Sequence, residues 1–125
     1  MSVEIKYVKD GVPLSGNVVN IALAGAANAV VIWTLSAAVA RVGVTSVKLK
    51  KVVITCNAIG ANPVVHIGTG VGGAFVDLVP AMTCIDNFDN PFDLNDVEAF
   101  ANVTCFPAVM AAGTIDVKIW VDEVS

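Results

Sequence analysis

The sequence predicts an all-β fold, a single antiparallel β-sandwich or jelly roll of about eight strands that spans residues 1–125. Short runs rich in Val, Ile and Thr recur along the chain. Turn-forming Gly, Pro, Asn and Asp separate these runs at a spacing of roughly 8–15 residues, a pattern typical of sandwiches and jelly rolls. With 125 residues and no visible repeat or linker, the chain fits one domain.

The N-terminal third is expected to contribute three strands. Residues Val3–Val8 alternate apolar side chains with Glu and Lys, which predicts a half-buried strand, and residues 9–13 read as a turn. Two apolar runs follow, Gly16–Ala24 and Asn28–Val39, with the small residues 25–27 between them. We interpret these runs as a pair of buried strands joined by a turn.

The remainder of the chain carries stronger strand patterns, rich in β-branched residues and bounded by Gly, Pro or Asn. Strands are predicted over Val47–Asn57, Pro63–Ile67, Ala74–Val79, Val97–Phe106 and Thr114–Val124. In the last of these, Val117, Ile119 and Val121 share one face. Residues 83–96 are crowded with Asp and Asn and are predicted to form a long loop.

The longest uncharged stretch, Gly11–Ala40, indicates a surface with unusually few charged residues. Charged residues make up 14% of the chain, against roughly 25% in ordinary soluble domains. Subunit interfaces or lipid are the natural destinations for the surplus apolar surface. Residues 18–40 are hydrophobic enough to be a membrane anchor, but Asn20 and Asn28 disfavour lipid, so membrane contact stays an unfavoured alternative. The N-terminus does not resemble a signal peptide.

The net charge of −4 argues against direct nucleic-acid binding, which depends on Lys and Arg neutralising phosphates. The only basic cluster is Lys48, Lys50 and Lys51, within a strand pattern. We predict that these lysines form a solvated strand face.

The segment Gly68-Thr69-Gly70-Val71-Gly72-Gly73 matches the G-x-G-x-x-G pattern of dinucleotide-binding loops. That motif requires a helix directly after it, and Pro80 follows too soon for one. We therefore predict a glycine-rich hairpin loop. His66 with a cysteine could form a nucleophile–base pair, but it lies mid-strand and no nucleophile motif accompanies it. We predict no catalytic residues and no enzyme activity.

Two further groups of residues are candidate binding sites. Trp33 and Trp120 could stack a sugar ring, although a core or interface role is preferred. Seven Asp and Asn residues could offer oxygen ligands to calcium, but their spacing does not match an EF-hand, and a solvated or subunit-contacting loop is preferred. These residues are Asp86, Asn87, Asp89, Asn90, Asp93, Asn95 and Asp96. No metal site and no cofactor is predicted.

Three cysteines, Cys56, Cys84 and Cys105, are too few for a disulfide framework. Cys56 and Cys105 lie in apolar strand patterns, where a free thiol behaves as a small hydrophobe. One disulfide among the three remains open.

Residues 47–124 resemble the small jelly-roll structural proteins of viruses and tailed phages, which serve as capsid, vertex or decoration subunits. The resemblance rests on four segments: VKLKKVVIT (47–55), PVVHIG (63–68), NPFDL (90–94) and AGTIDVKIWV (112–121). It implies a non-enzymatic virion protein, made in the host cytoplasm without a signal peptide. It also implies a homo-oligomer, possibly a trimer, that contacts other capsid proteins through apolar strand faces and loop 83–96.

Two other functions remain as alternatives. The chain could be a subunit of an extracellular filament or surface lattice, joined by strand addition at exposed sheet edges. It could also be a membrane-associated protein anchored through residues 18–40.

Overall fold

The computed structural model describes residues 13–19, 25–35, 43–108 and 112–124. These residues contain nine strands and two short 3-10 helices. The strands are β1 (Pro13–Val19), β2 (Val30–Trp33), β3 (Ser46–Asn57), β4 (Val64–Thr69), β5 (Val76–Asp77), β6 (Met82–Thr83), β7 (Asp89–Ala99), β8 (Val103–Pro107) and β9 (Thr114–Val124). The 3-10 helices are η2 (Ala26–Asn28) and η3 (Gly72–Ala74).

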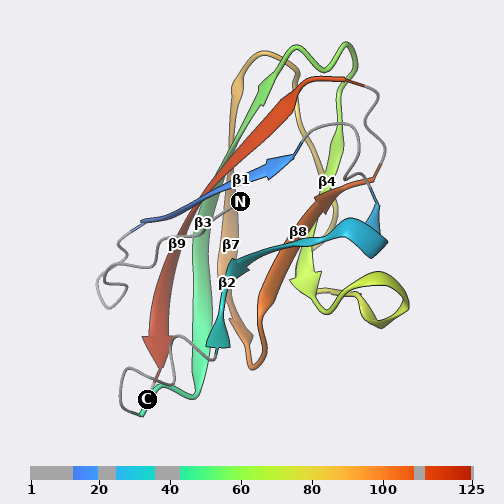
Figure 1. The fold of residues 1–125 in the computed structure, drawn as a ribbon. Coiled ribbons are helices and arrows are strands. Elements are labelled where there is room, and N and C mark those ends of the chain that lie inside the picture. The colour runs from blue at the N-terminus through green and yellow to red at the C-terminus, as the bar shows by residue number, and fades with distance from the viewer. Residues whose placement is uncertain (1–12, 20–24, 36–42, 109–111, 125) are drawn as a thin grey trace.

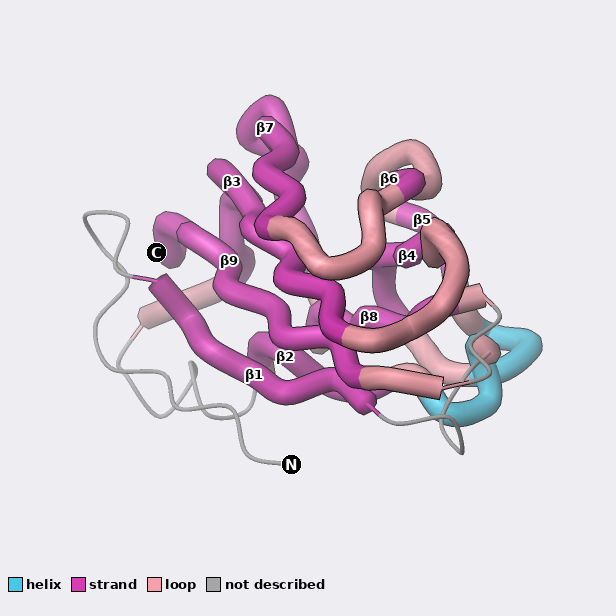
Figure 2. The backbone as a smooth tube through the Cα atoms, turned by 90° about the horizontal axis from the view of Figure 1, so that it is seen from above, coloured by secondary structure: helices cyan, strands magenta, loops and turns pink. Residues whose placement is uncertain are grey.

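The strands form two antiparallel sheets packed face to face (Figure 1). One sheet has the order β1-β9-β3-β7, and the other has the order β2-β8-β4-β5 with β6 beside β4. Figure 2 shows the two layers from above, with β1, β9, β3 and β7 side by side in one of them. Strand β1 pairs with β9, β2 with β8, β3 with β7, and β4 with β5. This nested pairing is the jelly-roll arrangement, so the predicted fold class is confirmed.

The core lies between the sheets and follows from alternation along each strand. In β9, Ile115, Val117, Ile119 and Val121 are buried, while the residues between them point outward. The predicted bounds of this strand and its apolar face are therefore correct. Trp33 of β2 is fully buried in the same core, which confirms a core role for this tryptophan.

A β-bulge interrupts the alternation in the middle of the four-stranded sheet. Leu49 lies opposite Val121 and Lys51 lies opposite Trp120, so Lys50 is an extra residue on β3. The register with β7 shifts at the same place. Because of this bulge, Lys50 and Lys51 both avoid the core.

The predicted loop over residues 83–96 is wrong, since β7 begins at Asp89 and only residues 84–88 connect it to β6. Asn90 and Leu94 point into the sandwich, while Asp89, Pro91 and Asp93 are exposed. Among the described strands, β7 is at the edge of its sheet, where Pro and Asp are tolerated because one side lacks ladder partners. The polar composition that suggested a loop is thus the outer face of an edge strand.

Three other expectations need correction. The predicted strand Val97–Phe106 is divided by a turn at residues 100–102 into β7 and β8. The predicted strand Ala74–Val79 shrinks to β5, because η3 occupies its start. The two apolar runs near the N-terminus do contain strands, β1 and β2, but these pair with β9 and β8 in different sheets and not with each other.

Several expectations fall partly or wholly outside the described residues. The predicted strand Val3–Val8 lies outside them, as do residues 20–24 and 36–40 of the candidate membrane anchor. The rest of that segment lies in β1, η2, β2 and the residues next to them. Within the described part of the chain, no helix is both long enough and apolar enough to cross a membrane.

Candidate functional site

The outer face of the five-stranded sheet carries an aromatic cluster, which we define as His66, Phe75 and Phe106. The His66 ring stacks on the Phe106 ring with centroids 4.7 Å apart. The Phe75 ring meets Phe106 edge-on, also at 4.7 Å between centroids. Nδ1 of His66 lies 3.0 Å from Oδ1 of Asp77, the adjacent carboxylate on β5. The Phe75 ring also lies edge-on to His66, with centroids 6.3 Å apart, so the imidazole is held in place from three directions.

The predicted alternative of a thiol–histidine pair is not assembled. Cys56, Cys84 and Cys105 are all buried in the core between the sheets, whereas His66 faces outward. Burial raises the pKa of the Cys84 thiol to about 12, and burial also raises the pKa of Cys105 and Cys56. All three are free thiols: Cys84 Sγ donates to the carbonyl oxygen of Met82 at 3.9 Å, and Cys56 Sγ accepts from the Asn90 carboxamide at 3.8 Å. Thiols with raised pKa values are poor nucleophiles at neutral pH.

The glycine-rich segment closes the β4–β5 hairpin, as predicted. Gly68 pairs with Asp77, and a side chain at Gly68 would overlap the carbonyl oxygen of Val76. Gly70 has a φ of +83°, and a side chain there would overlap the carbonyl oxygen of Ala74. The glycines are therefore required by close backbone approach. The only helix in the segment, η3, is three residues long, too short for the dinucleotide motif.

The first group of Asp and Asn residues fixes the loop that precedes β7. The Asp86 carboxylate accepts hydrogen bonds from the backbone N–H groups of Ile59 (3.0 Å) and Gly60 (2.8 Å). These bonds hold the pKa of Asp86 below its ordinary value. Asn87 accepts a hydrogen bond from the backbone of Ala58 at 2.9 Å. The side-chain oxygens of Asp86 and Asn87 thus accept hydrogen bonds from the backbone N–H groups of the β3–β4 connection.

Asn90 secures the same loop from the inside. Its buried carboxamide donates to the carbonyl oxygens of Ile54, Ile85 and Phe88, and accepts from the N–H of Ile85 at 2.7 Å. A buried amide with all its groups paired is strongly specified by its surroundings.

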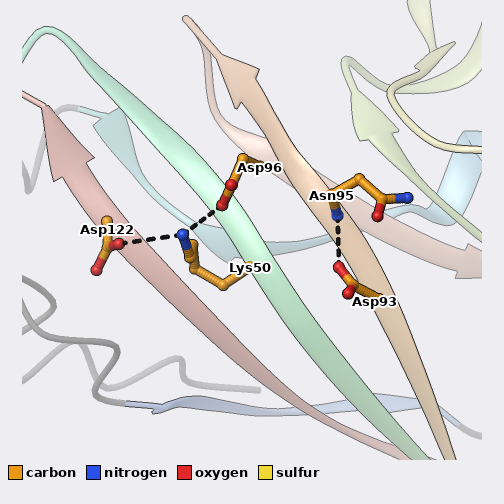
Figure 3. Close-up of polar contacts among 5 residues, drawn as sticks. All are labelled: Lys50, Asp93, Asn95, Asp96 and Asp122. Atoms are coloured by element: carbon orange, nitrogen blue, oxygen red, sulfur yellow. Dashed lines mark hydrogen bonds and ion pairs between the residues drawn. The ribbon is translucent and has the colours of Figure 1, made fainter.

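The second group lies farther along β7, beside the bulge (Figure 3). The Asp93 carboxylate accepts from the backbone N–H of Asn95 at 2.8 Å. Asp96 forms an ion pair with Lys50, whose Nζ also lies 3.7 Å from Asp122 of β9. The hydrogen bond to Asp96 is the main cause that raises the pKa of Lys50. Lys50 therefore links β7, β3 and β9 at the bulge.

The predicted calcium ligands are thus divided between two places, and most of their oxygens are engaged by the protein itself. Across the described ranges, no group of three or more His, Cys, Asp or Glu side chains is placed to hold a metal ion.

The remaining predicted residues lie on the outer face of the four-stranded sheet. Lys48 and Lys51 are exposed on β3, as expected of a solvated strand face. Trp120 is half-buried on that face, and Nζ of Lys51 lies 5.0 Å from its ring centroid. Neither tryptophan is thus freely presented to a sugar, because Trp33 is in the core and Lys51 lies over Trp120.

The two sheets differ sharply in charge. Strands β3, β7 and β9 each carry at least three charged residues. Strands β2, β4, β5, β6 and β8 together carry one, Asp77. Sequence reasoning did not identify Phe75, Phe106 and Asp77 as neighbours of His66. The period-2 alternation of β4 indicates that His66 shares a face with Val64 and Gly68, but the neighbours come from other strands.

Comparison with protein-family models, with curated proteins and with solved structures found no match to this chain.

Proposed function

We propose that this chain is a non-enzymatic structural subunit of a virion, a capsid, vertex or decoration protein that self-assembles through the outer face of its five-stranded sheet. The observation that carries the proposal is the uneven distribution of charge on a jelly-roll frame, with one carboxylate on five strands. Jelly rolls are a recurrent architecture of viral shells. The expected setting is the virion, after assembly in the host cytoplasm.

The composition of the five-stranded face supports a protein partner. Interface cores are depleted in charge and enriched in aromatic residues. Here the aromatic cluster shares its face with Val64 of β4 and Val31 of β2, both of which are half-buried. A second copy of this chain is the occupant we propose, in a symmetric homo-oligomer such as a trimer, with other capsid proteins as further partners. The charged four-stranded face then stays in water.

The edge of the four-stranded sheet disfavours assembly by strand addition there. β7 carries Pro91, an exposed Asp93 and the bulge beside Asp96. Proline, charge and bulges are the features that protect edge strands from pairing with another chain. The filament alternative therefore receives no support at this edge. The net charge of −4 likewise favours protein contacts over nucleic acid.

The test is the mass of the purified full chain, measured by light scattering on the size-exclusion peak, with negative-stain images of the same fraction. We expect a discrete oligomer, ring or particle. A Thr83→Glu variant places a charge on an exposed position of the five-stranded face, because Thr83 pairs with Val64 on the same side of the sheet as His66, and it should shift the protein to monomer. A matched Val53→Glu variant, opposite Lys118 on the four-stranded face, should assemble as the parent does.

Two results would overturn the proposal. One is a parent chain that remains monomeric at about 1 mM, since an association that weak contributes only about 4 kcal/mol. The other is equal assembly of the parent and Thr83→Glu, which would remove the five-stranded face as the interface.

A further inference from the structure

An open groove of about 540 Å³ lies at one end of the outer face of the four-stranded sheet, away from the aromatic cluster. It is lined by Thr55 and Asn57 of β3, Asn87 and Phe88 of the loop before β7, Asp89 of β7 and Asp116 of β9. The three strands meet here because Thr55 lies opposite both Asp89 and Asp116. The volume falls within the range of about 300–1,000 Å³ that small-molecule sites occupy.

Phe88 presents its ring to solvent from a backbone that is fixed on several sides. Its side chain is 64% exposed. Its carbonyl oxygen accepts hydrogen bonds from the Asn90 carboxamide at 3.0 Å and from the Cys56 N–H at 3.2 Å. Asp86 and Asn87 anchor the same loop to the β3–β4 connection. An exposed aromatic ring on a pre-organised loop binds a ligand without the entropic cost of ordering that loop.

The polar groups of the groove can accept further hydrogen bonds from a ligand. Oδ1 of Asp89 accepts a hydrogen bond from Oγ1 of Thr55 at 2.6 Å, which leaves the second carboxylate oxygen available. Among the described residues, the side chains of Asp116 and Asn57 have no hydrogen-bond partner. Of the residues that the structure describes, no Lys or Arg lines the groove. Hydroxyl donors are therefore suited to this site, and anionic ligands are disfavoured by the two carboxylates.

We propose that this groove binds a neutral saccharide. A pyranose ring has an apolar C–H face that packs on an exposed aromatic ring, here Phe88, and hydroxyls that donate to carboxylates and amides, here Asp89, Asp116 and Asn57. The two carboxylates do not form a cation site, since within the described ranges no group of three or more His, Cys, Asp or Glu side chains is placed to hold a metal ion. This binding activity goes beyond the proposed assembly role and uses a different face of the molecule.

The test is saturation-transfer difference NMR on the full chain, in whatever assembly state it adopts, because this method observes the sugar. The probes are cellobiose, maltose, lactose and N,N′-diacetylchitobiose at up to about 20 mM, enough to occupy a site with a Kd of about 1 mM. At least one should receive saturation, strongest at the C–H protons of one ring face. Sialyllactose, which is anionic, should give a weaker signal.

Variants locate the site. Phe88→Ala should weaken binding at least about tenfold, the size of one lost aromatic contact. Phe100→Ala is the matched control, because Phe100 is equally exposed (68%) but lies just beyond the other end of β7 and should bind as the parent does. Asp116→Asn keeps the shape of the groove and should also weaken binding. It therefore tests the site even if Phe88→Ala fails to fold.

The proposal is overturned if none of the four neutral disaccharides receives saturation. It is also overturned if Phe88→Ala and Asp116→Asn both bind as tightly as the parent. Spermidine serves as a cationic probe: if it protects the chain from thermal unfolding while no disaccharide does, the groove is a polyamine site and the saccharide assignment fails.

Discussion

The two outer faces of this jelly roll share one core but are built by different physical means. On the four-stranded face, charged side chains alternate with the core residues, and Lys50 joins Asp96 and Asp122 across the bulge. On the five-stranded face, ring stacking, close backbone contact at Gly68 and the His66–Asp77 contact take the place of lysine–carboxylate ion pairs. Contacts that depend on shape are intolerant of added volume. Exposed ion pairs contribute little individually and respond to salt.

On the proposed function, the four-stranded face stays in contact with water and the five-stranded face contacts another copy of the chain. A charged strand face tolerates most substitutions that remain polar, because solvent replaces what is lost. The five-stranded face gains little favourable hydration free energy, since β4 and β8 expose no Lys, Arg, Asp or Glu side chain. Its geometry is nevertheless tightly fixed, and a fixed apolar face is what a pre-organised interface requires.

The largest effect is expected from Gly68→Ala on the five-stranded face. A Cβ there would overlap the Val76 carbonyl oxygen and the Phe75 ring, so β5 must move away from β4. We expect a loss of about 3 kcal/mol in the free energy of unfolding, or roughly 10 °C in Tm. Thermal unfolding followed by circular dichroism measures this change.

Gly73→Ala is the matched control for that experiment. It lies in the same glycine-rich segment, but a Cβ there meets no atom within 4 Å. Its Tm should be unchanged or slightly higher, because alanine lowers the entropy of the unfolded chain. Equal destabilisation by both variants would mean that the segment needs flexibility, and the steric account of the five-stranded face would be wrong.

A smaller, pH-dependent effect is expected from Asp86, an acidic residue stabilised by backbone hydrogen bonds and not by a lysine. Its folded-state pKa lies below the ordinary value of 3.8. The stabilisation is therefore fully present above pH 3.8 and is lost as the pH falls through the lower, folded-state pKa. At pH 7, Asp86→Asn should lower Tm by about 4 °C, and the difference should shrink in strong acid.

The measurement is Tm against pH for the parent and Asp86→Asn. Asp116→Asn changes the net charge equally without removing a carboxylate that accepts backbone hydrogen bonds, and it serves as the control. A difference between the parent and Asp86→Asn that does not vary between pH 7 and pH 2 would contradict the assigned role of these bonds.

Strand content was predictable from the sequence where one face is clearly apolar. The bounds of β9 follow from its alternation, and β3 was predicted to within one residue. The first eight residues of β7 were missed because its outward Asp89, Pro91 and Asp93 resemble a loop when considered without the partner strand that makes them an edge. The membership of β1 and β2 in different sheets is equally non-local, since it depends on pairing with β9 and β8.

The candidate sites were less predictable for the same reason. The roles of Asp86 and Asn90 are decided by backbone groups on β3 and its connection to β4, about thirty residues away in sequence. The groove beside Phe88 requires three strands to be aligned in register. Alternation along one strand indicates which residues share a face, but it does not indicate what lies across from them.

The smallest effect is expected from Lys50→Met on the four-stranded face. The side chains of Lys50, Asp96 and Asp122 are 39%, 57% and 33% exposed, so water screens both ion pairs. The pKa of Lys50 is raised, so the stabilisation is present at neutral pH and is lost only as the pH rises above 10.5. Met keeps the apolar stem, so we expect Tm to fall by less than about 2 °C, and the difference to vanish at about 0.5 M NaCl.

Lys48→Met is the control, since Lys48 lies on the same strand outside the bulge. A salt-independent loss of about 10 °C in Lys50→Met alone would show that the bulge needs this residue for its shape. The four-stranded face would then resemble the five-stranded face in its dependence on close fit, and the contrast between them would lie only in charge. A small, salt-sensitive loss in Tm would instead show that the backbone forms the bulge without help from the Lys50 side chain. The specificity of this fold would then reside in its core and in the glycine-dependent packing of the five-stranded sheet.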